Sequence, residues 1–354
     1  MKNYTAEQIL SMTKAGDLFT NDPSICKKEY RDLSKFWHPD TNKSPKSKDV
    51  FSKIGELYQA ALKDFESGTW EKTNFVRLAL NNGTFIEMTY LDKFDFELGI
   101  CYITRTKVVY VLNASSAKYV PLMKSGLSRL SYRDKEMEDY FSRFFPQDLK
   151  YREIDGTGEK VIIFSKTDDV YPLKNLLQYF NRVGLQNKDK HIAWVITRLL
   201  NIAVLFNRSG IVHNGICLEN CFVSPHYHTI LLYGGWWYST EVGSKMTGTT
   251  KGIYDVMPVT AKTSKTSSFI TDLESIKLLG RQLFGNENCR KLAEDTQVPK
   301  PIADFLISGS SDDALKELKT WDSVLESTYG ERKFIKLEVT PDEMYERRDS
   351  HGNA

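Results

Sequence analysis

Hydrophobic positions in the first 66 residues recur at the spacing of one helix face. Between Pro23 and Trp37 these positions are Cys26, Tyr30, Leu33 and Trp37. A second stripe with helical spacing consists of Phe51, Ile54, Tyr58, Ala61 and Phe65. Asp22 followed by Pro23 is a typical helix cap and first helical position. The pattern predicts two helices that pack antiparallel, joined by a loop over residues 38–47.

From about residue 75 to residue 165 the pattern changes to short runs of β-branched and aromatic residues. These runs predict strands at Phe85–Tyr90, Tyr102–Leu112, Tyr119–Met123 and Val161–Phe164. One helix is predicted among them, near Arg133–Phe145. This segment is therefore expected to be rich in β-structure.

Helical patterns return after Tyr171. They predict helices at Leu173–Phe180 and His191–Phe206, then a hairpin of Cys221–Val223 with Ile230–Tyr233. Residues 240–268 are rich in Thr, Ser, Lys and Gly, which predicts a loop. A further helix is expected from Thr271 to about Phe284, with Glu274 completing a capping box at its start. The whole pattern predicts an α+β protein.

Charge and composition limit the partners and the cellular location that we expect for the protein. The 354 residues carry 48 basic and 46 acidic side chains, a formal charge of +2, so we do not expect a nucleic-acid partner. No apolar run reaches the roughly 18 residues that a bilayer crossing needs, and the N-terminus lacks a signal-peptide core, so we expect a cytoplasmic protein without a membrane partner. We expect neither a metal site nor a cofactor.

The helix at residues 23–37 carries a row of cations beside its apolar stripe. They are Lys27, Lys28, Arg31 and Lys35, and His38-Pro39-Asp40 follows the helix directly. The segment SICKKEYRDLSKFWHPDTNKSPKSKDVFSKIGELYQAAL resembles the J-domain of DnaJ-type co-chaperones. The resemblance implies that His38, Pro39 and Asp40 act on a DnaK-type ATPase chaperone and stimulate its ATP hydrolysis. It also implies that the four cations form the docking patch.

The order of elements after residue 75 resembles that of a protein kinase, with a β-rich lobe before a mainly helical one. Three segments support the resemblance. Ile211–Asn220 is similar to the catalytic loop HRDLKPEN, Leu231–Gly235 occupies the place of the DFG motif, and Thr271–Ile276 resembles the start of the helix whose Asp, here Asp272, supports the catalytic loop. The resemblance implies a bilobal kinase-like fold.

The departures from the kinase motifs concern the acidic groups that phosphoryl transfer needs. The catalytic Asp position is Gly215 and the metal-binding Asp position is Tyr233, while His213 and Asn220 persist. Lys124 is the candidate for the lysine of the third strand, with Glu136 or Glu138 as its helix partner. We expect an inactive, pseudokinase body with no catalytic residues.

These resemblances divide the chain into five segments. They are a J-domain (1–66), a linker (67–74), a kinase-like N-lobe (75–182), a C-lobe (183–330) and a charged, frayed tail (331–354). The expected function is a co-chaperone or adaptor whose kinase-like body recruits an unknown client or scaffold protein. Two alternatives stay open: an atypical nucleotide-binding phosphotransferase working from Lys124 and Asn220, and a decoy or scaffold that occupies a host chaperone for a virus or mobile element.

Overall fold

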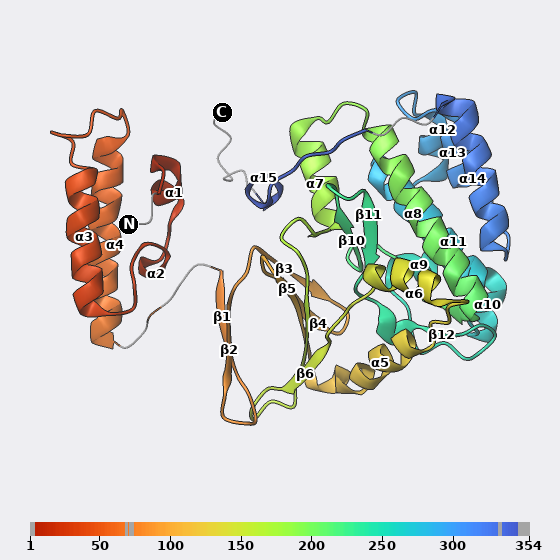
Figure 1. Cartoon of the computed structure of the whole chain (residues 1–354), viewed down its shortest axis with the longest axis horizontal. Coiled ribbons are helices and arrows are strands. Elements are labelled where there is room, and N and C mark those ends of the chain that lie inside the picture. The colour runs from red at the N-terminus through yellow and green to blue at the C-terminus, as the bar shows by residue number, and fades with distance from the viewer. Residues whose placement is uncertain (1–3, 68–69, 71–73, 332–334, 346–354) are drawn as a thin grey trace. The chain divides into compact units, whose positions relative to one another are not determined.

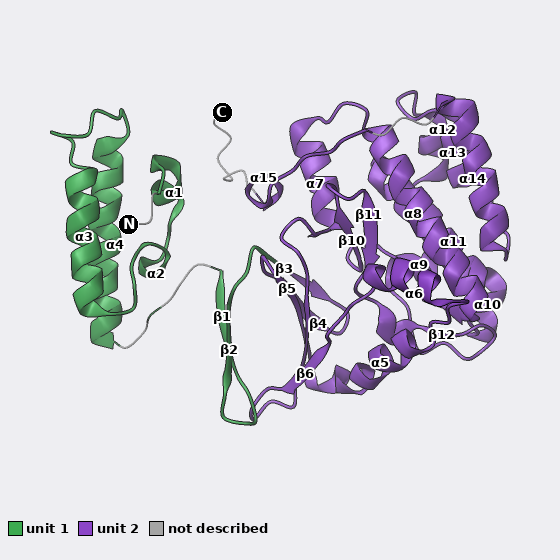
Figure 2. Cartoon of the chain, in the orientation of Figure 1, with its two compact units in different colours: residues 1–92 green, residues 93–354 purple. Residues whose placement is uncertain are grey.

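A computed structural model of the chain describes residues 4–67, 70, 74–331 and 335–345 (Figure 1). The chain divides into two compact units, residues 1–92 and residues 93–354 (Figure 2). The division lies beyond the predicted linker at 67–74, most of which falls outside the described residues. The strand pair that follows this linker therefore belongs to the first unit.

Unit 1 begins with four helices and ends with a β-hairpin. The helices are α1 (Ala6–Ser11), α2 (Ala15–Leu18), α3 (Pro23–Phe36) and α4 (Ser47–Ser67), and the antiparallel strands are β1 (Phe75–Ala79) and β2 (Phe85–Thr89). Asp22 caps α3 as predicted, because its carboxylate accepts hydrogen bonds from the backbone N–H groups of Ser24 and Ile25.

Helices α3 and α4 lie side by side (Figure 1). The ring of Tyr30 stacks on that of Tyr58 at 4.0 Å, and the ring of His38, just after α3, meets that of Phe51 near the start of α4. Residues late in one helix therefore face residues early in the other, so the predicted antiparallel packing is confirmed. The predicted stripes supply much of the buried core, to which α4 also contributes Val50 and Leu57.

Unit 2 begins with a five-stranded sheet of order β3-β4-β5-β7-β6. Its strands are β3 (Asp92–Phe96), β4 (Gly99–Ile103), β5 (Lys107–Leu112), β6 (Lys150–Glu153) and β7 (Lys160–Ser165). The connection from β5 to β6 is helical. It contains η1 (Ala114–Tyr119), α5 (Val120–Ser128), α6 (Lys135–Phe141) and η2 (Ser142–Phe144).

The strand predicted at Tyr119–Met123 is therefore wrong, because these residues lie in η1 and α5. Pro121 stands in the first turn of α5, where its missing N–H costs no helical hydrogen bond. The run predicted as one strand at Tyr102–Leu112 is a hairpin, since the chain turns at residues 104–106 between β4 and β5.

The rest of unit 2 is mainly helical. Its elements are β8 (Tyr171–Pro172), α7 (Leu173–Val183), α8 (Lys188–Ser209), β9 (Ile211–Val212), β10 (Cys221–Ser224), β11 (Thr229–Leu232), η3 (Trp236–Tyr238), β12 (Thr240–Glu241), α9 (Lys251–Val256), α10 (Val259–Ser264), α11 (Phe269–Phe284), α12 (Cys289–Glu294), α13 (Lys300–Ile307), α14 (Ala314–Tyr329) and α15 (Pro341–Tyr345). The hairpin predicted at residues 221–233 is confirmed by the antiparallel pairing of β10 with β11.

Three predictions for this part are wrong. Residues 240–268 are not a loop throughout, because they contain β12, α9 and α10. Glu274 does not complete a capping box, because its carboxylate accepts a hydrogen bond from the backbone N–H of Ser310. The tail is not frayed over residues 335–345, where Leu337 and Met344 are buried in the core of unit 2; residues 332–334 and 346–354 lie outside the described part.

Within the described residues, no helix is both long enough and apolar enough to cross a membrane.

Candidate functional site

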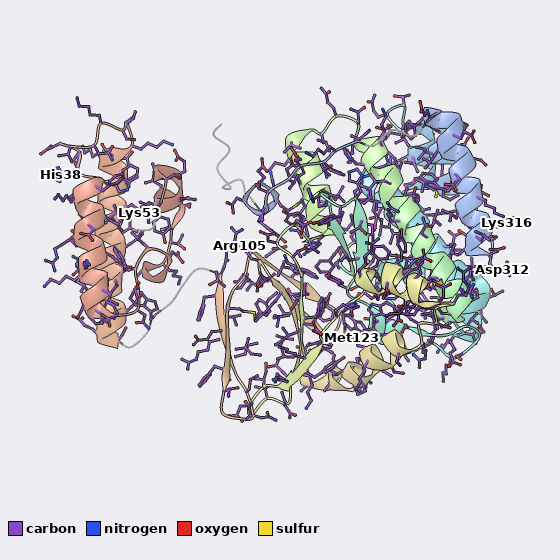
Figure 3. The ribbon with its side chains drawn as sticks, viewed as in Figure 1. His38, Lys53, Arg105, Met123, Asp312 and Lys316 are labelled. Carbon is purple, nitrogen blue, oxygen red and sulfur yellow. The ribbon has the colours of Figure 1, made fainter. Side chains whose placement is uncertain are left out.

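The loop between α3 and α4 presents His38, Pro39 and Asp40. Helix α3 ends at Phe36, because the following Trp37 turns into the core and Pro39 cannot extend the helix. The side chain of Asp40 is 84% exposed and that of His38 is 43% exposed. Figure 3 shows His38 at the end of α3 where the loop begins. The tripeptide is thus available to a partner.

Local hydrogen bonds hold this loop in one conformation. The carbonyl of His38 accepts from the backbone N–H groups of Thr41 (3.0 Å) and Asn42 (2.8 Å), and the side-chain amide of Asn42 donates to the carbonyl of Phe36. The Nδ1 atom of His38 accepts from the N–H of Asp40 at 3.2 Å. The Asp40 carboxylate lies 3.7 Å from the same nitrogen.

The cationic row on α3 reaches solvent. Lys27, Lys28, Arg31 and Lys35 are exposed, and none of them forms an ion pair with another described residue. The Nε of Arg31 donates to the carbonyl of Lys27 one turn earlier at 3.4 Å. These charges therefore have no ion-pair partner in the described part of unit 1. We call Lys27, Lys28, Arg31 and Lys35 the basic row of α3.

In unit 2, Asp272 supports the segment that resembles a catalytic loop. One carboxylate oxygen of Asp272 accepts from the N–H of His213 at 2.7 Å, and the other accepts from the N–H of Asn214 at 2.8 Å. Burial raises the pKa of Asp272 to about 7, although both hydrogen bonds act to lower it. The structure thus brings together the helix and the loop that the kinase resemblance relates.

His213 is a packing residue of this loop. Its fully buried ring stacks on Phe206 at 5.8 Å and meets the edge of Trp236 at 4.9 Å. Burial lowers the pKa of His213 to about 3, because the imidazolium form would lose its hydration. The ring is therefore neutral at pH 7.

Replacing His213 with Phe should reduce the loss of stability at acid pH. The unfolded chain binds a proton at His213 below pH 6.5 and the folded chain does not until about pH 3, so stability is lost as the pH falls. Between pH 7 and pH 5 the free energy of unfolding of the wild-type chain should fall by about 2 kcal/mol because of His213. The variant lacks this histidine and should not show this part of the loss. Urea unfolding of both proteins at the two pH values measures the difference; an equal loss in both would contradict a neutral buried His213.

Asn220 closes the loop on itself. Its side-chain amide donates to the carbonyl of Gly215 at 2.9 Å, and its own carbonyl accepts from the N–H groups of Tyr233 and Gly234. Gly215, which the kinase resemblance aligns with the catalytic Asp, has no side chain. The ring of Tyr233 packs on Phe164 and Phe222, and burial raises its pKa. Neither Gly215 nor Tyr233 therefore supplies a carboxylate.

The placement of Lys124 on a third strand is wrong. Lys124 lies on α5 and is exposed, and it forms no ion pair with Glu136, which is exposed on α6. Glu138, the other proposed partner, pairs with Lys135 at 3.1 Å. The third strand of the sheet in chain order is β5, in which Tyr110 is fully buried.

The hydroxyl of Tyr110 lies close to the backbone of Gly234. A Cβ atom at Gly234 would lie 2.7 Å from the hydroxyl of Tyr110 and 2.3 Å from Oδ1 of Asn220. Tyr110 therefore lies against the Leu231–Gly235 segment, which the kinase resemblance compares with the DFG motif. Tyr110 is not evident from the sequence, because a tyrosine in an apolar strand is indistinguishable from an ordinary core residue.

Aromatic rings fill the space around Tyr110. Phe96 lies 5.3 Å from Tyr110 and 5.4 Å from Trp237, and Trp237 meets Tyr110 edge-on at 5.2 Å. Phe164 closes the group at 6.1 Å from Tyr110. We call these four residues the aromatic cluster. It places packed rings between the sheet and the catalytic-loop segment.

A cavity of about 460 Å³ lies beside the aromatic cluster, and both Phe96 and Asn220 line it. Its lining contains three carboxylates, from Asp95, Glu97 and Glu219, and one lysine, Lys251. This balance of charge repels a polyphosphate. Among the described residues, no group of three or more His, Cys, Asp or Glu side chains is arranged to hold a metal ion.

Comparison with known proteins supports the fold of unit 2. No protein-family model and no curated protein sequence matches the chain. Solved structures do. A rhoptry kinase from Toxoplasma gondii matches with a TM-score of 0.52 and 11% identity, covering 75% of this chain and 87% of its own. Unit 2 has a protein-kinase-like fold.

Two further kinase domains are also similar in structure to this chain. A Toxoplasma gondii rhoptry antigen kinase domain matches with a TM-score of 0.51 and 11% identity, over 76% of this chain and 91% of its own. The ROP18 kinase domain in complex with AMP-PNP and sucrose matches with a TM-score of 0.51 and 12% identity, over 75% and 88%. At these identities the likeness concerns the fold alone.

Proposed function

We propose that the chain is a J-domain co-chaperone or adaptor that engages a DnaK-type ATPase chaperone. The observation that carries the proposal is the loop of unit 1. It holds His38, Pro39 and Asp40 in a hydrogen-bonded, exposed turn at the end of a helix whose basic row has no ion-pair partners among the described residues. A fixed turn beside free cations is suited to an acidic partner surface. In this proposal residues 1–66 form the J-domain, which binds the chaperone in the cytoplasm.

In this proposal unit 2 is a pseudokinase that recruits a client or scaffold. Gly215 and Tyr233 supply neither acid, and the cavity that Asn220 lines carries three carboxylates against one lysine, which disfavours a polyphosphate. Magnesium-dependent phosphoryl transfer needs a metal-binding carboxylate and room for phosphates. The same features weigh against the alternative of an atypical phosphotransferase, as does the exposed place of Lys124 on α5. Nucleotide-dependent phosphate release that disappears in Lys124→Ala and Asn220→Ala would favour that alternative.

Charge reversal in the basic row should weaken binding to the chaperone. The double variant Lys27→Glu, Arg31→Glu places two acidic groups against an acidic partner surface, which we expect to lower affinity at least about tenfold. Added salt should weaken wild-type binding as well. The measurement is fluorescence anisotropy of the labelled chain titrated with a DnaK-type chaperone and ATP.

The matched control reverses two exposed lysines of α4, in the double variant Lys48→Glu, Lys63→Glu. This variant has the same net charge as the test variant, so an equal loss in both would show a general charge effect rather than docking through α3. No measurable binding by the wild-type chain would count against both the co-chaperone and the decoy functions.

A further inference from the structure

A second cavity of unit 2, of about 560 Å³, shares no lining residue with the cavity beside the aromatic cluster. It lies among the segment of α6 and η2, the chain after β7, helix α8 and the β10–β11 hairpin. Its volume is within the range that small-molecule sites occupy. Neither the J-domain resemblance nor the kinase motifs assign a role to it.

Three cationic side chains converge on this cavity. They are Arg143, Lys166 and Arg198, and the lining contains no carboxylate. Arg198 donates its Nε–H to the carbonyl of His228 at 3.1 Å, which fixes the side chain and leaves its terminal nitrogens without an ion pair among the described residues. An arginine held in this way is suited to a planar or tetrahedral anion.

Lys166 is the buried cation of the set, with only 7% of its surface exposed. Its ammonium group donates to the carbonyls of Arg105 (2.9 Å) and Thr167 (3.1 Å), which leaves one of its three protons for a further acceptor. The acidic side chains nearest to Lys166 are those of Asp168 and Asp169, which follow it closely in the chain. Asp168 is exposed, and the carboxylate of Asp169 is hydrogen-bonded to the hydroxyl of Ser224.

Aromatic rings provide the apolar part of the lining. Tyr140 and Tyr227 are 42% and 69% exposed at the cavity, and Tyr233 is buried in its wall. Arg143 lies over the ring of Tyr140 at 4.7 Å, so a cation and an aromatic face stand together. Rings of this kind offer a stacking surface to a planar ligand.

We propose that this cavity binds a small organic anion that carries a planar ring, with its phosphate or carboxylate at Arg143 and Arg198 and its ring against the tyrosines. The proposal does not depend on the function of unit 1. It gives the kinase-like unit a ligand site that shares no lining residue with the cavity at Asn220, whose charged lining is mainly acidic.

The test uses two fluorescent probes that differ only in one sulfonate group, 8-anilinonaphthalene-1-sulfonate and its neutral analogue N-phenyl-1-naphthylamine. With the full chain, the sulfonate should bind saturably at one site. In the double variant Arg143→Gln, Arg198→Gln its dissociation constant should rise at least about tenfold, while that of the neutral probe changes less than about twofold. The conservative double variant Arg143→Lys, Arg198→Lys should retain most of the sulfonate affinity.

A near-ultraviolet circular dichroism spectrum equal to that of the wild-type chain shows that the variant is folded. If the double variant fails to fold, Arg143→Gln alone, at an exposed side chain, should still weaken the sulfonate selectively. Displacement of the sulfonate by phenyl phosphate or by benzoate identifies the acidic group that the site prefers. Unchanged sulfonate affinity in the variants, an equal loss of both probes, or displacement by neither competitor would overturn the proposal.

Discussion

Replacing Asp272 with Ala should lower the free energy of unfolding of unit 2 by about 3–5 kcal/mol. The carboxylate of Asp272 accepts from the backbone N–H groups of His213 and Asn214, and all three residues are buried. Alanine would leave both donors without an acceptor and open a space in the core. The measurement is urea unfolding of the full chain followed by near-ultraviolet circular dichroism, which reports mainly on unit 2 because it holds four of the six tryptophans.

The neighbouring Thr271→Val substitution is the matched control. Thr271 is equally buried on α11, and its hydroxyl has no hydrogen-bond partner among the described residues. Valine has the same shape without the polar group, so its stability should equal or slightly exceed that of the wild-type chain. Equal destabilisation by the two substitutions would mean that α11 supports the loop by packing alone.

Replacing His38 with Gln should abolish acceleration of the chaperone's ATP hydrolysis while leaving unit 1 folded. The imidazole of His38 is half exposed beside Asp40, so a docked partner would meet it directly. Its removal costs unit 1 one short-range hydrogen bond and one ring contact with Phe51, together about 1 kcal/mol. We expect the rate to fall to that of the chaperone alone.

Lys43→Gln is the control for this prediction, because it changes an exposed residue of the same loop outside the tripeptide. It should stimulate nearly as well as the wild-type chain. Far-ultraviolet circular dichroism should show the same helix content in both variants. A His38→Gln variant that stimulates as fast as the wild-type chain would remove His38 from the proposed contact.

Helices with a clear apolar stripe could be predicted from the sequence. Cys26, Leu33 and Ile54 are buried as their spacing indicates, because in α3 and α4 one face meets the core and the other meets water. The strands β3 and β6 could not be predicted in this way. They are the outer strands of the sheet, and their charged residues, such as Asp92 and Lys150, interrupt the apolar pattern that marks a buried strand.

The residues of the kinase-like site could be predicted from the sequence only where they belong to short motifs. The segment at Asp272 could be found because it has a characteristic order relative to the loop at His213 and Asn220. Tyr110 could not be predicted as a residue of this site, since its surroundings in β5 are those of an ordinary core residue. The run KVVYVL in β5 contains the only signal, one hydroxyl-bearing ring among aliphatic residues. Only the three-dimensional packing of Tyr110 against Gly234 shows that this tyrosine belongs to the site.

The central claim is that unit 1 stimulates a DnaK-type chaperone, and single-turnover ATP hydrolysis by such a chaperone tests it most directly. A saturating amount of the wild-type chain should raise the hydrolysis rate at least about tenfold, and the His38→Gln variant should leave it unchanged. Binding in the anisotropy assay without acceleration would contradict stimulation and favour a decoy that occupies the chaperone. An unchanged rate with no binding would contradict chaperone engagement altogether.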